Sequence, residues 1–379
     1  MSPAMALKPE TKEEDDTVQL ESQYQKGVKH LCDSGINQVP NKYIWPVSDR
    51  PNVNDGEQKE FKKNLKLPII DFSELQGSNR PQVLESLANA CEQYGFFQLI
   101  NHGIPSDVIS SMIDVGTRFF ELPMEEREKY MSSDMRSPVR YGTSFNQNKD
   151  SVFCWRDFLK LMCHPMSDVL LHWPSSPVDF RKSAVTYAKE TKHLFLMLIE
   201  AILESLGLVG TTEEKKTEEE DDILKEFQDG SQLMVVNCYP ACPEPNLTLG
   251  MPPHSDYGCL TLLLQDEVEG LQIQFQDKWV TVEPIANSFV VNVGDHLEIF
   301  SNGKYKSVLH RVSVNSMKSR LSVASLHALP LDSVVKPSPK LINEANPRRY
   351  MDTDFYSFLD YISSCEPKRK NFLDSRKMG

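Results

Sequence analysis

The chain has 379 residues with 41 basic and 54 acidic side chains, so its formal net charge at pH 7 is −13. This balance argues against a nucleic-acid-binding surface and against binding to anionic membranes, because both of these partners are negatively charged. The longest apolar run, Leu194 to Ile199, is much too short to span a membrane, and the N-terminus shows no signal or transit peptide. Eight cysteines without a Cys-x-x-Cys pair indicate reduced thiols and predict a cytoplasmic protein, with a nuclear location also open.

The first two regions of the chain are predicted to be mainly helical. Residues 1–65 are expected to form a polar leader, a loose helix and a Pro-rich loop, and the leader is expected to be partly disordered. Region 66–210 is expected to be an α+β region. Its predicted elements are a strand at 69–72, a helix at 81–94, a buried strand at 96–100, and helices at 106–123 and 179–206.

A run of charged residues from Glu213 to Asp222 follows these helices. We interpret residues 211–230 as a solvated linker loop, because a charge-rich segment carries too little apolar area to pack. On this interpretation the run is dispensable for folding and activity. The alternative is a tail that binds a partner.

From residue 231 the pattern changes to strands. Leu271, Ile273 and Phe275 alternate with glutamines, as in a half-buried strand. Helices followed by strands indicate an α+β fold without βαβ units. We predict a double-stranded β-helix (jelly-roll) barrel over 231–335, braced by the N-terminal helices, and a helical segment over 336–379.

Two histidines and one carboxylate in this region have the pattern of a non-haem iron site. His254 and Asp256 are two residues apart, so they share a face of an extended segment, and His310 must reach the same point from another strand. A His-x-Asp triplet alone is weak evidence, since surface histidines are common. Two histidines and a carboxylate bind iron while leaving positions open for chemistry, so we predict His254, Asp256 and His310 as metal ligands.

Arg320 and Ser322 repeat the two-residue spacing on a later strand. The Arg320 guanidinium would bind the distal carboxylate of a 2-oxo acid in a charge-assisted pair. Arg311 alternates to the opposite strand face and is a poor candidate for this role. The seven other histidines are expected in turns, loops and helices, and His296 beside Asp295 forms a second His/Asp pair with poorer spacing.

These motifs resemble those of the plant 2-oxoglutarate- and Fe(II)-dependent dioxygenases of flavonoid and specialised metabolism, similar to flavanone 3-hydroxylase-like and downy-mildew-resistance-like oxygenases. The resemblance covers roughly residues 65 to 365. The segments that carry it are His254-Ser255-Asp256, SNGKYKSVLHR at 301–311, Arg320-Leu321-Ser322, NCYP at 237–240, GFFQLINHG at 95–103 and WRDF at 155–158.

The resemblance implies an enzyme that uses Fe²⁺, 2-oxoglutarate and O₂, with ascorbate in support. It would release succinate and CO₂ while it hydroxylates, O-demethylates or desaturates a small plant metabolite such as a flavonoid or other phenolic. Two further co-substrate residues are implied, Tyr239 and Asn237. The expected substrate pocket includes Phe145, Phe300 and Leu326.

Two alternatives stay open at this point. One is an oxidase of the same fold that uses no 2-oxo acid, and the other is a catalytically inactive protein that binds a small ligand. In each case we expect a monomer with a small-molecule ligand and with no nucleic-acid or membrane partner.

Overall fold

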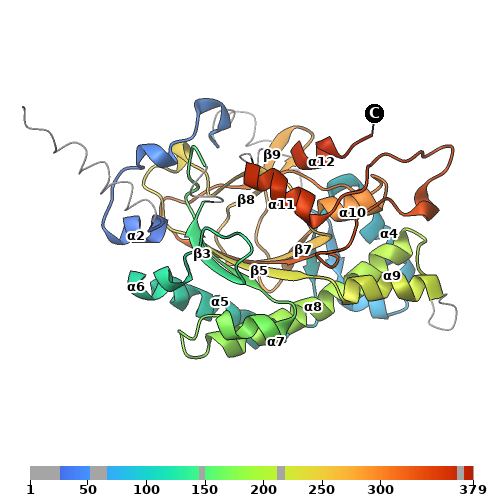
Figure 1. Ribbon diagram of the computed structural model, residues 1–379, viewed down its shortest axis with the longest axis horizontal. Coiled ribbons are helices and arrows are strands. Elements are labelled where there is room, and N and C mark those ends of the chain that lie inside the picture. Colours follow the sequence, from blue (N-terminus) through green and yellow to red (C-terminus); the bar gives the residue numbers. More distant parts are fainter. Residues whose placement is uncertain (1–25, 52–65, 145–149, 211–217, 365–370, 379) are drawn as a thin grey trace, which may run out of the picture.

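The fold is built on two β-sheets that form a jelly roll (Figure 1). The computed structural model describes residues 26–51, 66–144, 150–210, 218–364 and 371–378. The larger sheet consists, in spatial order, of β1 (Ile69–Asp71), β2 (Phe96–Ile100), β10 (Phe289–Val293), β7 (Leu260–Gln265), β12 (Arg320–His327), β5 (Gln232–Tyr239), β4 (Asp157–Met162) and β3 (Val139–Thr143). The smaller sheet consists of β6 (Met251–His254), β11 (His310–Val312), β8 (Leu271–Phe275) and β9 (Lys278–Thr281).

The strand pairs of both sheets are antiparallel, except that β1 pairs with β2 in parallel. Four strands of the larger sheet, β1 to β4, come from the region predicted as 66–210. The predicted regions 66–210 and 231–335 therefore share one sheet, and together they form the double-stranded β-helix.

Helices cover the face of the larger sheet that is turned away from the barrel interior (Figure 1). The long helices of this layer are α4 (Arg80–Asn89), α5 (Ser106–Glu121) and α8 (Phe180–Ser205). The other described α-helices are shorter and lie around the two sheets: α2 (Val28–Asp33), α6 (Met124–Arg127), α7 (Met166–Val169), α9 (Glu218–Gln228), α10 (Asp295–Phe300), α11 (Phe355–Ser364) and α12 (Asn371–Ser375). A π-helical turn, Ala90–Tyr94, continues α4 to Gly95, where the chain has a left-handed conformation that glycine adopts easily.

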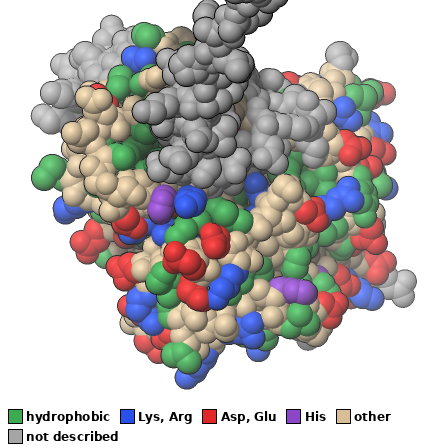
Figure 2. Space-filling view, turned by 60° about the vertical axis from the view of Figure 1, so that its left-hand side comes forward, with side chains coloured by type: hydrophobic (Ala, Val, Ile, Leu, Met, Phe, Trp, Pro, Cys, Tyr) green, Lys and Arg blue, Asp and Glu red, His purple; other side chains and the backbone are tan. Residues whose placement is uncertain are grey.

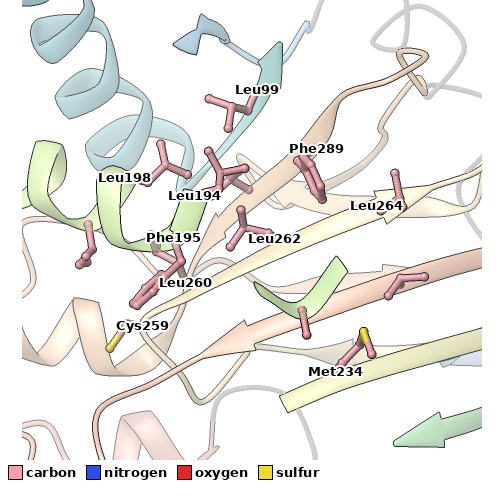
Figure 3. Close-up of a cluster of buried hydrophobic side chains, with 14 of the residues drawn as sticks. Leu99, Leu194, Phe195, Leu198, Met234, Cys259, Leu260, Leu262, Leu264 and Phe289 are labelled. Carbon is pink, nitrogen blue, oxygen red and sulfur yellow. The ribbon is translucent and has the colours of Figure 1, made fainter. Parts of the chain in front are cut away.

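The main hydrophobic core lies between the helices and the larger sheet. On β7, Leu260, Leu262 and Leu264 are buried in the main core, and Figure 3 shows Leu260 and Leu262 near Leu194 and Phe195 of α8, with Leu264 further along the strand. Burial of each such side chain stabilises the fold by about 1.5–3 kcal/mol. Since strand side chains alternate, this packing turns the intervening residues of β7 toward the barrel interior.

The acidic segment differs from its prediction. Residues 211–217 lie outside the described residues, but Glu218–Gln228 forms α9, so the prediction of a loop is wrong there. Ile223, Leu224 and Phe227 recur at helical spacing and pack against the main core, and Phe227 is 2% exposed. Deleting 213–222 would remove the start of this packed helix.

Candidate metal and co-substrate site

His254, Asp256 and His310 converge inside the barrel. His254 ends β6 and His310 begins β11, and these two histidines are direct partners in the antiparallel pairing. Asp256 Oδ1 lies 3.8 Å from His254 Nε2 and 3.7 Å from His310 Nε2. Within the described parts of the chain, these three residues form the one group of His, Cys, Asp and Glu side chains that could hold a metal ion.

Hydrogen bonds orient both imidazoles. His254 Nδ1 lies 2.8 Å from the carbonyl oxygen of Pro252, and His310 Nδ1 lies 3.3 Å from that of Val308. A carbonyl oxygen can only accept, so each Nδ1 is the protonated nitrogen and each Nε2 keeps a free lone pair toward Asp256. Such outer contacts commonly fix the ring orientation of metal-binding histidines.

Two donors fix the carboxylate of Asp256. Thr261 Oγ1 donates to Oδ2 at 2.6 Å, and Asn292 Nδ2 donates to the same oxygen at 2.8 Å. Thr261 of β7 and Asn292 of β10 are paired across the sheet. Neither residue was predicted from the sequence, although each is a polar residue inside an apolar strand, on the face opposite the core.

The protonation states suit a divalent cation. Burial and the neighbouring His310 lower the pKa of His254 to about 3, so this imidazole is neutral at pH 7. Burial alone would raise the pKa of Asp256, but His310, His254 and the two donors outweigh burial, and the net shift is downward. A neutral imidazole and an ionised carboxylate are the forms that bind metals, and two histidines with one carboxylate fit non-haem Fe²⁺.

Arg320 lies on β12 beside the triad. Its Nη2 donates to Gln265 Oε1 at 2.9 Å, its Nε donates to the Val268 carbonyl at 3.1 Å, and its guanidinium lies 5.2 Å from the ring centroid of Tyr239. The residue is 3% exposed, and its charge also acts on the Asp266 carboxylate, where it opposes the rise in pKa that burial causes. A buried guanidinium held by neutral acceptors fits the carboxylate of a co-substrate.

The predicted co-substrate residues lie on two neighbouring strands. In the pairing of β5 with β12, Tyr239 lies opposite Arg320 and Asn237 lies opposite Ser322. Ser322 Oγ is 3.4 Å from Arg320 Nη1. Together with the triad, these four residues line a cavity of about 500 Å³.

The three predicted pocket residues have different outcomes. Leu326 of β12 lines this cavity. Phe300 packs edge-to-face on Phe227 of α9, with ring centroids 6.1 Å apart, and is not among the described residues that line the cavity, so that prediction is wrong. Phe145 lies outside the described residues.

His327 and His296, two histidines that were not predicted as metal ligands, lie in different surroundings. His327 points into the helical layer, where it stacks on Phe195 at 4.3 Å. His296 lines the cavity from α10 and is buried, but it is not part of the metal-binding group.

The C-terminal helices form a cavity wall that the sequence analysis did not predict. Phe355, Phe358 and Leu359 of α11 and Phe372 of α12 line the cavity. Phe358 stacks on Tyr257, two rings whose centroids are 3.9 Å apart. The segment predicted only as helical thus adds an aromatic wall to the cavity beside the triad.

Two family models match the chain. Residues 67–178 match the N-terminal region of non-haem dioxygenases in morphine synthesis, and residues 230–328 match the 2OG-Fe(II) oxygenase superfamily. The chain therefore belongs to the 2OG-Fe(II) oxygenase superfamily. It is a dioxygenase that uses Fe²⁺ and 2-oxoglutarate.

Individual relatives agree with this assignment. The chain is 43% identical to Protein DMR6-LIKE OXYGENASE 1 of Arabidopsis thaliana over 85% of this chain and 88% of the relative. It is 40% identical to Flavanone 3-dioxygenase 2 of Oryza sativa subsp. japonica, over 85% and 89%. The crystal structure of JOX2 in complex with 2OG, Fe and JA is similar with a TM-score of 0.80 and 32% identity, over 93% of this chain and 98% of that one.

Proposed function

We propose that His254, Asp256 and His310 bind the Fe²⁺ of this dioxygenase. The observation that carries the proposal is the convergence of their three ligand atoms within 4.8 Å, in a cavity that also contains Arg320. Arg320 binds the distal carboxylate of 2-oxoglutarate, with Ser322 and Tyr239 beside it. Asn237 adds a polar contact from β5.

The bound metal supplies the redox chemistry that couples decarboxylation of 2-oxoglutarate to oxidation of a second substrate by O₂. The chain's own residues orient the reactants. Arg320 holds the co-substrate at one end, the Thr261 and Asn292 contacts keep Asp256 in place, and the apolar walls exclude water. Holding both reactants in a fixed geometry lowers the barrier by removing the entropy cost of bringing them together.

The organic substrate is proposed to be a small aromatic metabolite such as a flavonoid or other phenolic, which is hydroxylated, O-demethylated or desaturated. The cavity volume of about 500 Å³ is in the range of small-molecule sites. Its aromatic lining includes Phe158, Phe355 and Phe358, which suit a flat ring. A relative that is 40% identical, Flavanone 3-dioxygenase 2, is named for a flavonoid.

A turnover assay tests this function. The iron-loaded protein is incubated with 2-oxoglutarate and a panel of flavonoids and other phenolics, and succinate and the mass of each compound are measured. We expect one succinate for each oxidised product. Oxidation without succinate would instead indicate an oxidase that uses no 2-oxo acid, and binding of a compound without turnover would indicate an inactive ligand-binding protein.

The protein is further proposed to act as a cytoplasmic monomer without nucleic-acid or membrane partners. The seven cysteines among the described residues are free thiols, which suits a reducing compartment. None of the described helices is long and apolar enough to cross a membrane. Light scattering coupled to gel filtration would check the oligomeric state, and a dimer mass would contradict it.

A further inference from the structure

Buried carboxylates are rare in this acidic chain. Figure 2 shows acidic side chains on the surface, interspersed with basic ones, and among the described residues three acids are buried: Asp157, Asp295 and Glu298. Removal of a carboxylate from water is costly, so each buried one is expected to accept several hydrogen bonds. Asp157 accepts them from the backbone at the start of α2 and from the Tyr141 hydroxyl, and so fixes α2 to β4. The other two lie three residues apart on α10.

Asp295 joins the two chain segments that carry the proposed iron ligands. Its Oδ2 accepts a hydrogen bond of 3.2 Å from the hydroxyl of Ser255, the residue between the first two ligands. Its Oδ1 accepts a hydrogen bond of 2.6 Å from the hydroxyl of Ser307, which lies three residues before the third ligand. One buried carboxylate thus contacts both segments.

Backbone contacts also hold the start of α10 against Asp256. The Asp295 N–H donates to the Asp256 carbonyl at 2.7 Å, and the His296 N–H donates to the Gly258 carbonyl at 3.0 Å. Gly294 permits this close approach, because a Cβ atom at that position would lie 2.2 Å from the Gly258 carbonyl oxygen and 3.0 Å from that of Asp256. The turn that carries Asp256 is therefore fixed to α10 by main-chain as well as side-chain contacts.

Glu298 fixes Ser307 from a second direction. Its Oε2 accepts a hydrogen bond of 2.6 Å from the Ser307 N–H, and its Oε1 accepts one of 2.7 Å from the Tyr350 hydroxyl. Ser307, which is 1% exposed, therefore donates its N–H to Glu298 and its O–H to Asp295. Both bonds go to α10, so the segment before His310 has little freedom to move relative to this helix.

The strand pairing at the triad is itself irregular. His254 of β6 and His310 of β11 are direct partners, but the register shifts before the next pair, Val312 with Met251. The two strands have four and three residues. An irregularity of this kind disrupts the hydrogen-bond ladder locally, so the pairing of β6 with β11 fixes the ligand separation only weakly. Asp295 supplies a second link between the same two segments.

We propose that Asp295 is a positioning residue that fixes the separation of the two segments on which the iron ligands lie. The inference rests on the proposed assignment of the two histidines and Asp256 to the metal. Asp295 is not part of that metal-binding group, and it acts through the hydroxyls of Ser255 and Ser307. Without these contacts the ligands would not be held at one separation, so a metal ion would have to order them on binding and its affinity would fall.

Metal binding by the full chain tests the proposal. Fe²⁺ and Co²⁺ are titrated without oxygen, since the visible absorption of bound Co²⁺ depends on its coordination geometry and so reports the arrangement of the ligands. Asp295→Ala should weaken Fe²⁺ binding about tenfold or more and alter the Co²⁺ spectrum. Asp295→Asn should recover most of this affinity, because its amide can accept from the Ser307 hydroxyl and donate to that of Ser255.

The two serines provide milder variants. Ser255→Ala and Ser307→Ala should each weaken Fe²⁺ binding about threefold or more in the wild-type protein, and neither should have a further effect in Asp295→Ala. Ser288→Ala is the matched control, because its buried hydroxyl donates to a backbone carbonyl at the other end of β10. Asp157→Ala removes a buried carboxylate that does not line the described cavity. Both controls should leave Fe²⁺ affinity unchanged, even where urea unfolding shows a lower stability.

A folded Asp295→Ala protein with wild-type Fe²⁺ affinity and an unchanged Co²⁺ spectrum would overturn the proposal. If this variant does not fold, the two serine variants decide, and wild-type affinity in both would overturn it equally. Equal losses in Ser288→Ala or Asp157→Ala would show that affinity follows stability alone, which also contradicts the inference. Asp256→Ala is measured in parallel. If it binds Fe²⁺ as tightly as the wild-type protein, the iron assignment itself is wrong, whereas loss of binding in Asp256→Ala alone would contradict only the role of Asp295.

Discussion

The side-chain amide of Asn292 donates a hydrogen bond of 2.8 Å to Oδ2 of Asp256, the same oxygen that receives the Thr261 hydroxyl. Both contacts leave Oδ1, the oxygen nearest the two histidines, available to a metal ion. Side chains of β7 and β10 thus orient the carboxylate of Asp256, a residue that lies on neither strand.

These contacts predict a loss of metal affinity when they are removed. Asn292→Leu and Thr261→Val should each weaken Fe²⁺ binding by about 10–100-fold, because the carboxylate loses an orienting donor. Titration of the apoprotein with Fe²⁺ without oxygen measures this directly. Thr281→Val on β9 is the control, since its hydroxyl bonds Gln272 away from the triad. Unchanged affinity in both variants would show that the two donors play no part in the metal site.

Arg320 is predicted to affect the co-substrate selectively. Arg320→Ala should raise the KM for 2-oxoglutarate by an amount equivalent to about 2–5 kcal/mol, because a buried carboxylate loses its charged partner. Arg320→Lys should recover only part of this loss, since an ammonium cannot make the paired contacts of a guanidinium. Steady-state kinetics with 2-oxoglutarate varied provide the measurement.

The control for Arg320 is a second buried arginine. Arg311 contacts Gln272 and lies 4.4 Å from the Trp279 ring, and it does not line the described cavity. Arg311→Lys should lower stability and leave the KM for 2-oxoglutarate unchanged. If Arg320→Ala altered only the constant for the organic substrate, its assigned role would be wrong.

The proximity of His254 and Asp256 could be predicted from sequence because strand geometry is local, whereas His310 reaches them through the pairing of β11 with β6. A period of two residues places His254 and Asp256 on one face, and the same period links Arg320 with Ser322. The partners of Asp256 could not be predicted in this way. Thr261 and Asn292 reach it through strand pairings between distant segments, and no local pattern specifies those pairings.

The prediction that Phe300 lines the substrate pocket failed because the local structure around it was not predicted. Asp295–Phe300 forms the short helix α10, which turns Phe300 toward Phe227. The packing of α9 was missed for a related reason. The acidic residues of this segment dominate its composition, whereas its fold depends on three apolar residues at helical spacing.

Phe227 therefore gives a prediction about α9. Phe227→Ala should destabilise the protein by about 3–5 kcal/mol, because it removes a buried aromatic ring from the main core. Asp221→Ala and Asp222→Ala, at exposed positions of the same helix, should change stability by less than about 0.5 kcal/mol. Urea unfolding at pH 7 measures all three. A small effect at Phe227 would mean that α9 does not contribute to the core.

His327 gives a prediction about pH. Burial, with a smaller effect of Lys192, lowers its pKa well below the usual value, so the folded protein keeps this ring neutral. The unfolded chain binds a proton below pH of about 6.5, and the stability contributed by neutral His327 is therefore present above that pH and lost as the pH falls. The loss approaches about 1.4 kcal/mol per pH unit only well below pH 6.5, so between pH 6.5 and 5 it is at most about 1.5 kcal/mol.

Replacement of His327 should flatten this dependence. Between pH 6.5 and 5, His327→Gln should lose up to about 1.5 kcal/mol less stability than the wild-type protein, whatever its stability at pH 7. His193→Gln, at an exposed position of α8, serves as the control and should follow the wild-type curve. Parallel unfolding curves for wild type and His327→Gln would show that the buried ring does not contribute to acid sensitivity.

The central claim is that iron bound by His254, Asp256 and His310 drives turnover of 2-oxoglutarate. The most direct test compares succinate release by the wild-type protein and by Asp256→Ala, each supplied with Fe²⁺, 2-oxoglutarate and O₂, with iron content and circular dichroism recorded on the same samples. We expect iron-dependent succinate release by the wild-type protein. For Asp256→Ala we expect a folded protein that binds little iron and releases no succinate above background. Near-normal succinate release by folded Asp256→Ala would contradict the account.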